Sequence, residues 1–314
     1  MRIGEVELGP GHPVRIVAEL GASHCQDISK AKDLIDAAHA AGADLVKMQI
    51  YTADEMCLPG VPCPAGPWQG QDLYELYKSA GTPWEWWPIL RDYATSKGVT
   101  LFSSAFSVEA IDYLLSEGCP AIKVSSHDTC LVVPRGVPTV RSVNSRDDAR
   151  AAVRERYMDM LLWCPGGYPA ADLDPLDMGW IAGLLDGDDH GVLCGLSDNS
   201  RGGNGWATAI RAGAALIEVH VHLRAGEGPD EAFALEPATL AHMVRFARTC
   251  DVPPPPYVNP YARCWWVTAP VRKGEAFTRA NTRMLRPAGG VTRLHHRRAA
   301  RDLDVGPLRE EDIE

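Results

Sequence analysis

GVLCGLSDNSRGGNGWATAIRAGAALIEVHVHLRAGEGPD, residues 191–230, decides the fold of this 314-residue chain. Two short apolar runs, 192–196 and 214–222, flank a Gly-rich turn and a segment of helix-forming residues. Short apolar runs bounded by turn residues are typical of buried strands. We therefore expect a strand, a helix and a second, parallel strand in this segment.

Polar side chains gather where these two runs end. The first run is followed by Ser-Asp-Asn at 197–199, and the second carries Glu218, His220 and His222 at alternate positions. Alternate residues of a strand share one face. A carboxylate and two imidazoles on a buried face lose their hydration, which is tolerated mainly where such groups bind a metal or react. A functional site is our interpretation, and a purely structural hydrogen-bond network is the alternative.

The composition is that of a globular protein with one large domain. An apolar fraction of 46% in 314 residues supports a large α/β domain plus a small appendage. There is no apolar run near the roughly 20 residues that cross a bilayer, and MRIGEVELGP lacks the features of a signal peptide. Nine scattered cysteines indicate reduced thiols. We expect a cytoplasmic protein without a membrane partner.

The charge is negative overall and unevenly distributed. A net charge of −10 argues against nucleic acid as a partner. From Arg263 onward, eleven Lys and Arg stand against seven Asp and Glu. Such a basic tail could dock on the acidic body or close over an anionic ligand, and an ordinary solvated surface is the alternative.

Strand and helix signals alternate along most of the chain. The expected strands are 15–20, 44–50, 99–103, 121–125, 137–141, 160–164, 192–196 and 214–222. The expected helices are 29–41, 83–97, 108–117, 145–157, 176–185, 203–212 and 237–250. Eight such alternations predict an α/β fold of the (β/α)8 TIM-barrel type. The connection HDTCLVVPRG, 127–136, is too short for a full helix, so we expect an irregular crossover there.

Reactive or hydrogen-bonding side chains stand at or just beyond nearly every expected strand end. They are Glu19, Lys47, Gln49, Ser103, Ser104, Lys123, Ser126, Ser142, Asn144, Tyr168, Ser197, Asp198, Glu218 and His220. The carboxyl ends of barrel strands converge on one mouth, where active sites of this fold lie. The sequence therefore predicts that these residues meet.

A Pro-rich spacer predicts the domain boundary. DVPPPPYVNPYAR, 251–263, restricts the backbone and marks a linker. We expect a barrel domain at 1–250, a linker at 251–262 and a small domain at 263–314. The last segment is too short to bury a large core alone, so we expect it to pack on its own barrel or on a neighbouring subunit.

Nine motifs, in their order along the chain, resemble those of the sialic acid synthase family. They are AELGASH (18–24), GADLVKMQ (42–49), FSSAF (102–106), KVSSHD (123–128), LLWCPGGYP (161–169), GLSDNS (195–200), IEVH (217–220), GPD (228–230) and RPAGG (286–290). Enzymes of that family condense phosphoenolpyruvate with an N-acetylated aldose to give nine-carbon 2-keto acids such as neuraminic, legionaminic or pseudaminic acid. The resemblance covers nearly the whole chain.

The resemblance implies an architecture and a phosphoenolpyruvate site. It implies a (β/α)8 barrel followed by a small antifreeze-like (SAF) domain, in a homodimer whose SAF domain places an arginine, here Arg286, in the partner's active site. The implied ligands of phosphoenolpyruvate are Lys47, Ser104, Lys123, Ser126, Ser197 and Arg286. These are cations and hydroxyl donors, which an anion requires.

The resemblance also implies catalytic and sugar-binding roles. Gln49, Tyr168 and Asp230 would contact the aldehyde substrate. A divalent metal, Mn²⁺ or Mg²⁺, would polarise the aldehyde while C3 of phosphoenolpyruvate attacks it, and water would add at C2 before phosphate leaves. Glu19 suits stabilisation of the cationic carbon or activation of that water. The other catalytic carboxylates of this interpretation are Asp128 and Glu218.

The expected metal site departs from the family pattern. The family holds its metal with two histidines, and here the first position is Asn199 while the second is His220. An amide oxygen is a weaker ligand than imidazole for a first-row metal. His222, which is expected to share the strand face of His220, is one candidate to replace the missing ring, and His127 is another.

Further departures gather around the expected sugar site. Ser23, Asp128, Trp163 and the pair 166–167 replace the residue types of the family motifs. The lysines and serines expected to bind phosphoenolpyruvate are retained. This pattern predicts condensation with an unusual aldehyde of specialised metabolism.

Two other functions fit the same residues. The barrel could serve an aldolase, a lyase or an epimerase of a keto acid, with Lys47 or Lys123 forming a Schiff base. Alternatively, the chain is a degenerate, non-catalytic homologue retained for binding or regulation.

Overall fold

The structure is a computed structural model with two compact units, Met1–Val252 and Pro253–Glu314. The residues that the structure describes are 1–155, 158–170, 175–185, 191–200, 205–226, 228–249, 264–285 and 297–313.

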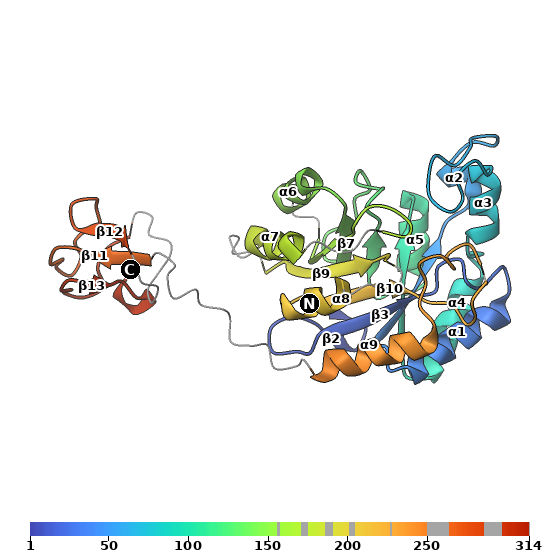
Figure 1. The fold of residues 1–314 in the computed structure, drawn as a ribbon, viewed down its shortest axis with the longest axis horizontal. Helices are drawn as coiled ribbons and strands as arrows, with labels where there is room; N and C mark the ends of the chain where they lie inside the picture. Colours follow the sequence, from blue (N-terminus) through green and yellow to red (C-terminus); the bar gives the residue numbers. More distant parts are fainter. Residues whose placement is uncertain are drawn as a thin grey trace. The chain divides into compact units, whose positions relative to one another are not determined.

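The first unit is a closed barrel of parallel strands (Figure 1). The barrel strands are β3 (Arg15–Glu19), β4 (Leu45–Ile50), β5 (Thr100–Ala105), β6 (Ile122–Val124), β7 (Thr139–Val143), β8 (Met160–Trp163), β9 (Leu193–Asp198) and β10 (Leu216–His220). Sequential strands are neighbours, and β10 pairs with β3 to close the barrel. Each lies within or beside a predicted strand, so the (β/α)8 prediction is confirmed.

Helices connect most of the barrel strands. They are α1 (Ile28–Ala40), α4 (Trp86–Ser96), α5 (Val108–Ser116), α6 (Arg146–Glu155), α7 (Pro175–Leu185), α8 (Gly205–Arg211) and α9 (Pro237–Thr249). All seven were predicted. The hairpin of β1 (Arg2–Ile3) and β2 (Val6–Glu7) and the short helices α2 (Ala53–Met56) and α3 (Leu73–Ala80) were not predicted. Their start signals are local: Thr52 and Glu55 form a capping box, and Asp72 caps α3.

The crossover between β6 and β7 has no helix, as predicted. The buried guanidinium of Arg141 holds this crossover in place by hydrogen bonds to its backbone. It donates to the carbonyl oxygens of Thr129 at 2.9 Å and Leu131 at 2.5 Å. These two bonds fix the crossover that carries Ser126 and Asp128.

An ion-pair cluster joins α9 to the barrel. The carboxylate of Asp44 accepts hydrogen bonds from the Ile16 backbone N–H at 2.8 Å, from Arg15 at 3.1 Å and from Arg248 at 2.6 Å. Asp44 precedes β4, so the cluster lies at the amino ends of the strands. That end of a barrel supports stability, which leaves the opposite end for chemistry.

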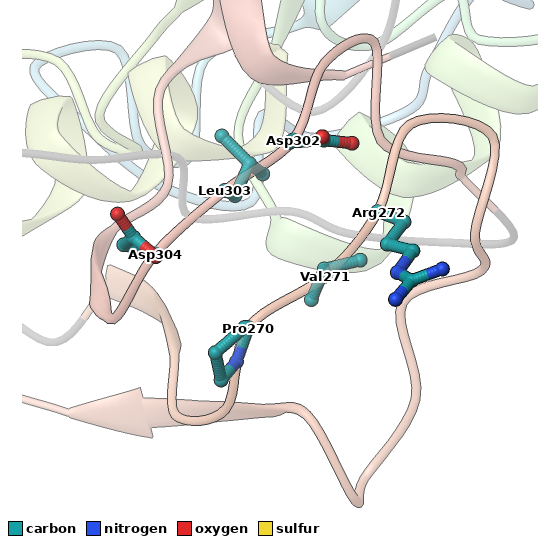
Figure 2. A pocket seen from close by; sticks show the side chains of 6 residues that line it. All are labelled: Pro270, Val271, Arg272, Asp302, Leu303 and Asp304. Carbon is teal, nitrogen blue, oxygen red and sulfur yellow. The ribbon is translucent and has the colours of Figure 1, made fainter.

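The second unit has a small sheet in the order β12–β11–β13, comprising β11 (Cys264–Val267), β12 (Thr282–Leu285) and β13 (Gly306–Pro307). A short 3-10 helix, Glu310–Asp312, follows. Val267, Val271, Ala299 and Leu308 form its core. A pocket of about 240 Å³ lies between 270–272 and 302–304 (Figure 2). None of the predicted site residues that the structure describes lines this pocket.

Two predictions from composition are tested by the described residues. The eight cysteines among them are all free thiols, as predicted. Within the same residues, no helix has the length and apolar character needed to cross a membrane.

Candidate active site

Two lysines and two glutamates meet, buried, at the carboxyl ends of the barrel strands. Glu19 and Lys47 form a close ion pair across β3 and β4. The Glu218 Oε1 atom on β10 lies 3.7 Å from Lys47 Nζ and 3.4 Å from Lys123 Nζ. None of the four is more than 3% exposed. The structure thus brings together four of the predicted site residues from four strands.

Hydroxyl groups surround this ion-pair network. Ser104 Oγ accepts from Lys47 Nζ at 2.8 Å, and Ser197 Oγ donates to Glu218 Oε1 at 3.2 Å. Gly21 donates its backbone N–H to Glu19 Oε1 at 2.8 Å. Glu218 Oε2 has no hydrogen-bond partner among the described residues. The network therefore keeps one buried carboxylate oxygen available for a ligand.

Burial and mutual attraction set the charges of the network. Burial works to raise the pKa of Glu218, but the charges of Lys123 and Lys47 outweigh it and lower that pKa to about 2. Burial also works to lower the pKa of Lys47, but Glu19 and Glu218 outweigh it and raise the pKa. Burial lowers the pKa of Lys123, with Glu218 opposing it. Glu218 is therefore a carboxylate at neutral pH.

Cys164, to which the sequence analysis gave no role, lies among the predicted phosphoenolpyruvate ligands. Its thiol forms hydrogen bonds with Ser197 and Ser126, and burial raises its pKa. The amide nitrogen of Asn199 donates to Cys164 Sγ at 3.4 Å. Cys164 directly follows β8. Its position at the end of a predicted strand is the sequence signal that could have placed it in the site.

His220 is held by Asp230, which the resemblance assigns to sugar binding. His220 Nδ1 lies 2.9 Å from Asp230 Oδ2, and the same oxygen accepts the Ala22 backbone N–H at 2.9 Å. Burial works to lower the pKa of His220, but Asp230 outweighs it and raises the pKa. Gly21 is required here: its φ is +49°, and an added Cβ would lie 2.0 Å from Asp230 Oδ2.

The other predicted residues occupy the same end of the barrel or its loops. Gln49 is two residues beyond Lys47 on β4 and therefore shares its face. Asp128 is half-buried in the β6–β7 crossover, and burial raises its pKa. Tyr168 is also half-buried, and burial raises the pKa of its hydroxyl, which stays protonated. Arg286 lies outside the described residues.

His24 is a buried imidazole with a fixed tautomer. Its Nδ1 accepts the Gln26 backbone N–H at 3.1 Å, so Nε2 carries the hydrogen and donates to Thr82 Oγ1 at 3.1 Å. Burial lowers the pKa of His24 from 6.5 to about 4, although Asp230 and Glu19 oppose the shift. Protonation would set two donors, Nδ1–H and the Gln26 N–H, against each other.

This lowered pKa predicts a loss of stability in mild acid. The unfolded state takes up a proton near pH 6.5 and the folded state only near pH 4, so the His24 contribution is full above pH 6.5 and lost as pH falls toward 4. Urea unfolding at pH 7 and pH 5 should show a decrease about 2 kcal/mol larger for the unmodified chain than for His24→Gln. Equal decreases in the two proteins would contradict the assignment.

Comparison with known proteins places the chain in a family. The profile described as "NeuB family" matches residues 34–133 and 131–252. The chain belongs to the NeuB family. The pseudaminic acid synthase of Helicobacter pylori is 32% identical, over 89% of this chain and 90% of its own. The N,N'-diacetyllegionaminic acid synthase of Legionella pneumophila is 28% identical, over 75% of this chain and 72% of its own.

A solved structure agrees with the fold. The crystal structure of the Bacillus subtilis spore coat polysaccharide biosynthesis protein SpsE is 27% identical and superposes with a TM-score of 0.64. The match covers 100% of this chain and 99% of SpsE. At these identities the chain is a divergent family member, as the resemblance predicted.

NeuB-family synthases depend on a metal, and the described part of this chain offers few ligands for one. The described residues contain no group of three or more His, Cys, Asp and Glu side chains that could hold a metal ion. His220 uses Nδ1 for Asp230, which leaves Nε2 as its ligand atom, the usual arrangement of a metal-binding histidine. Val219 pairs with Asp198, so His220 and Asn199 follow on neighbouring strands. These two side chains fit a weakly held ion.

The two candidate replacements for the missing imidazole stay predictions. His222 is buried, and its Nδ1 has no hydrogen-bond partner among the described residues. It lies beyond the end of β10, where its N–H bonds to the Leu235 carbonyl oxygen at 3.1 Å. His127 is exposed and packs near Tyr168 at 6.5 Å between ring centroids.

Proposed function

We propose that this chain condenses phosphoenolpyruvate with a sugar-like aldehyde to give a 2-keto acid and inorganic phosphate. The observation that carries the proposal is the buried network of Lys47, Lys123, Glu19 and Glu218 at the barrel mouth. Relatives in the NeuB family are named pseudaminic acid synthase and N,N'-diacetyllegionaminic acid synthase, which supports this reaction class.

Phosphoenolpyruvate is bound by the cations and hydroxyls of the mouth. Lys47 and Lys123 face its phosphate and carboxylate, and Ser104, Ser126 and Ser197 donate hydrogen bonds to the same groups. Charge-assisted hydrogen bonds of this kind strengthen in a site from which water is excluded. The ligand competes with Glu218 for both lysines, so it binds by rearranging the ion pairs.

Carbon–carbon bond formation precedes loss of phosphate. The C3 carbon attacks the aldehyde carbon, the aldehyde oxygen takes up a proton, and positive charge develops at C2. Glu19 stabilises this charge and accepts a proton from the water that adds at C2, while Glu218 and Asp128 are the further acid–base candidates. The C2–O bond to the bridging oxygen then breaks, the new C2 hydroxyl loses its proton to become the keto oxygen, and phosphate leaves with the bridging oxygen and that proton.

A divalent metal, Mn²⁺ or Mg²⁺, would polarise the aldehyde carbonyl when bound. His220 Nε2 and Asn199 Oδ1 would hold it, and Asp230 fixes the orientation of the His220 ring. Tyr168 and Gln49 orient the aldehyde through its hydroxyl groups, because both lie at the same end of the barrel. His222 is the proposed additional ligand.

Asn199→His is expected to strengthen metal binding by at least about tenfold, because imidazole is the better ligand for a first-row metal. Electron paramagnetic resonance of free Mn²⁺ during titration measures this directly, without an activity assay. Asn199→Gln is the matched control, since it keeps the amide. Equal Mn²⁺ affinity in Asn199→His and the unmodified chain would show that this position does not face the ion.

The C-terminal unit is proposed to be an antifreeze-like (SAF) domain. Our proposed division is a barrel domain at 1–250, a linker at 251–262 and the SAF domain at 263–314. In a homodimer, this domain would bring Arg286 to the phosphoenolpyruvate of the partner's site. The basic balance of the segment after Arg263 supports an anionic target.

The proposed reaction is tested by release of phosphate from phosphoenolpyruvate with a panel of aldoses and N-acetylated aldoses. Release that depends on an aldehyde, together with a 2-keto acid product of matching mass, supports the proposal. Release without any aldehyde at every metal concentration would contradict it. Borohydride trapping with pyruvate separates the Schiff-base alternative, because a condensing synthase forms no lysine adduct.

A further inference from the structure

Three aromatic side chains from distant segments form a continuous layer beside His220. We define Trp68, Tyr168 and Phe233 as the aromatic wall. The ring centroids of Trp68 and Tyr168 lie 5.7 Å apart, those of Tyr168 and Phe233 5.1 Å, and those of Trp68 and Phe233 6.0 Å. All three pairs are thus within the range of favourable aromatic contacts.

Specific contacts fix Trp68 in this layer. Its indole Nε1 donates to the Pro229 carbonyl oxygen at 2.9 Å, although the two residues are 161 positions apart in the chain. Its ring meets Phe233 edge-on, with an interplanar angle of 90°. The connection between α2 and α3, which carries Trp68, is therefore joined to the loop that carries Asp230.

The aromatic wall reaches the reacting groups through Phe233. Phe233 is 2% exposed, and its ring lies 4.9 Å from the His220 imidazole at an interplanar angle of 73°. The Phe233 backbone N–H also donates to the Asp230 carbonyl oxygen at 3.0 Å. Trp68 and Tyr168 are only half-buried. They therefore retain accessible surface.

The chemistry of this surface suits an apolar substituent better than a hydroxyl group. The Trp68 N–H is already used by Pro229, and His220 and Asp230 bond to each other. The Tyr168 hydroxyl is the polar group of the aromatic wall that forms no hydrogen bond with a described residue. A sugar hydroxyl set against the Trp68 ring, away from the Tyr168 hydroxyl, would lose hydration without compensation, whereas a methyl group would gain from burial.

We propose that Trp68 determines acceptor specificity by packing against an apolar substituent of the aldehyde, such as an acetamido methyl group. This inference rests on the proposed function and adds a residue that none of the predicted site positions includes. Trp68 acts by contact with the acceptor and has no contact with phosphoenolpyruvate. Its removal therefore changes the choice of aldehyde and leaves phosphoenolpyruvate binding unchanged.

The test compares N-acetyl-D-mannosamine with D-mannose, which differ in the C2 substituent alone. Phosphate release is measured for the full chain, Trp68→Ala and Trp68→Phe. We expect the full chain to prefer the acetamido sugar by at least about tenfold in kcat/KM, and Trp68→Ala to lose most of that preference. Trp68→Phe keeps a ring but not the N–H donor, so it should retain most of the preference. The KM for phosphoenolpyruvate should stay within about twofold.

The outcomes separate specificity from a structural role. Equal losses with both sugars, or a large change in the KM for phosphoenolpyruvate, would assign Trp68 to loop stability and overturn the inference. No preference in the full chain, or no turnover of the acetamido sugar by a chain that binds phosphoenolpyruvate, would also overturn it. The proposed function fails separately, through absence of phosphoenolpyruvate binding.

Discussion

Glu19→Gln is expected to lower kcat by about a thousandfold, the range of a positioned acid–base group. The substitution preserves the shape of a fully buried side chain and its contact with the Gly21 N–H, but it removes the negative charge beside Lys47. The KM for phosphoenolpyruvate should stay the same or fall, because the ligand then competes with one carboxylate fewer. Steady-state phosphate release at saturating substrates measures both quantities.

Glu75→Gln is the matched control for this variant. Glu75 is an exposed residue of α3 that pairs only with the exposed Lys78 among the described residues, and the same change there should leave kcat unaffected. A Glu19→Gln protein that folds normally and retains more than about a tenth of the activity would remove Glu19 from the acid–base step.

Lys123→Met is expected to weaken phosphoenolpyruvate binding by about a hundredfold or more, the scale of removing one partner of a buried charge pair. Methionine fills a similar volume without the ammonium group. Glu218 then loses one of its neutralising cations, so its negative charge repels the anionic ligand more strongly. Calorimetric titration of the full chain measures the loss. Lys78→Met, at an exposed position of α3, is the matched control.

A second variant separates binding from folding. Leaving Glu218 with one buried cation fewer also destabilises the fold. Lys123→Met combined with Glu218→Gln removes this unbalanced charge, so thermal stability should recover while phosphoenolpyruvate binding should not. Recovery of both would show that Lys123 serves the fold and does not bind the ligand.

The barrel could be predicted because each strand has a local signal in the sequence. Short apolar runs separated by helical periodicity locate β3 to β10, and the parallel order follows from the alternation. The short helix α3 was missed because it spans only 8 residues and is flanked by Pro- and Gly-rich segments. Its N-cap, Asp72, is a local signal that is readable only once the helix boundary is suspected.

The site could be predicted as a set of residues but not as a set of contacts. Lys47, Lys123, Ser197 and Glu218 lie on four different strands of one closed barrel, which can therefore bring them together. Which lysine pairs with which carboxylate depends on strand register. The Asp230–His220 pair depends on a loop conformation that needs Gly21 at positive φ. No local sequence pattern predicts this pair.

The position of Trp68 in the site is still harder to predict from the sequence. It lies in an irregular segment between α2 and α3, and its partners Pro229 and Phe233 follow more than 160 positions later. A single tryptophan in a Pro- and Gly-rich loop has no periodicity that indicates burial on one side. Only the folded loops bring it to the barrel mouth.

Calorimetric titration of the full chain with phosphoenolpyruvate, with and without Mn²⁺, is the decisive measurement for the proposed binding site. We expect one site per chain with a Kd below about 1 mM, the ordinary upper range for an enzyme's substrate. We also expect binding to survive removal of Mn²⁺, because Lys47, Lys123 and the serines hold this ligand. Absence of binding under both conditions by a folded chain would contradict the assignment of this site.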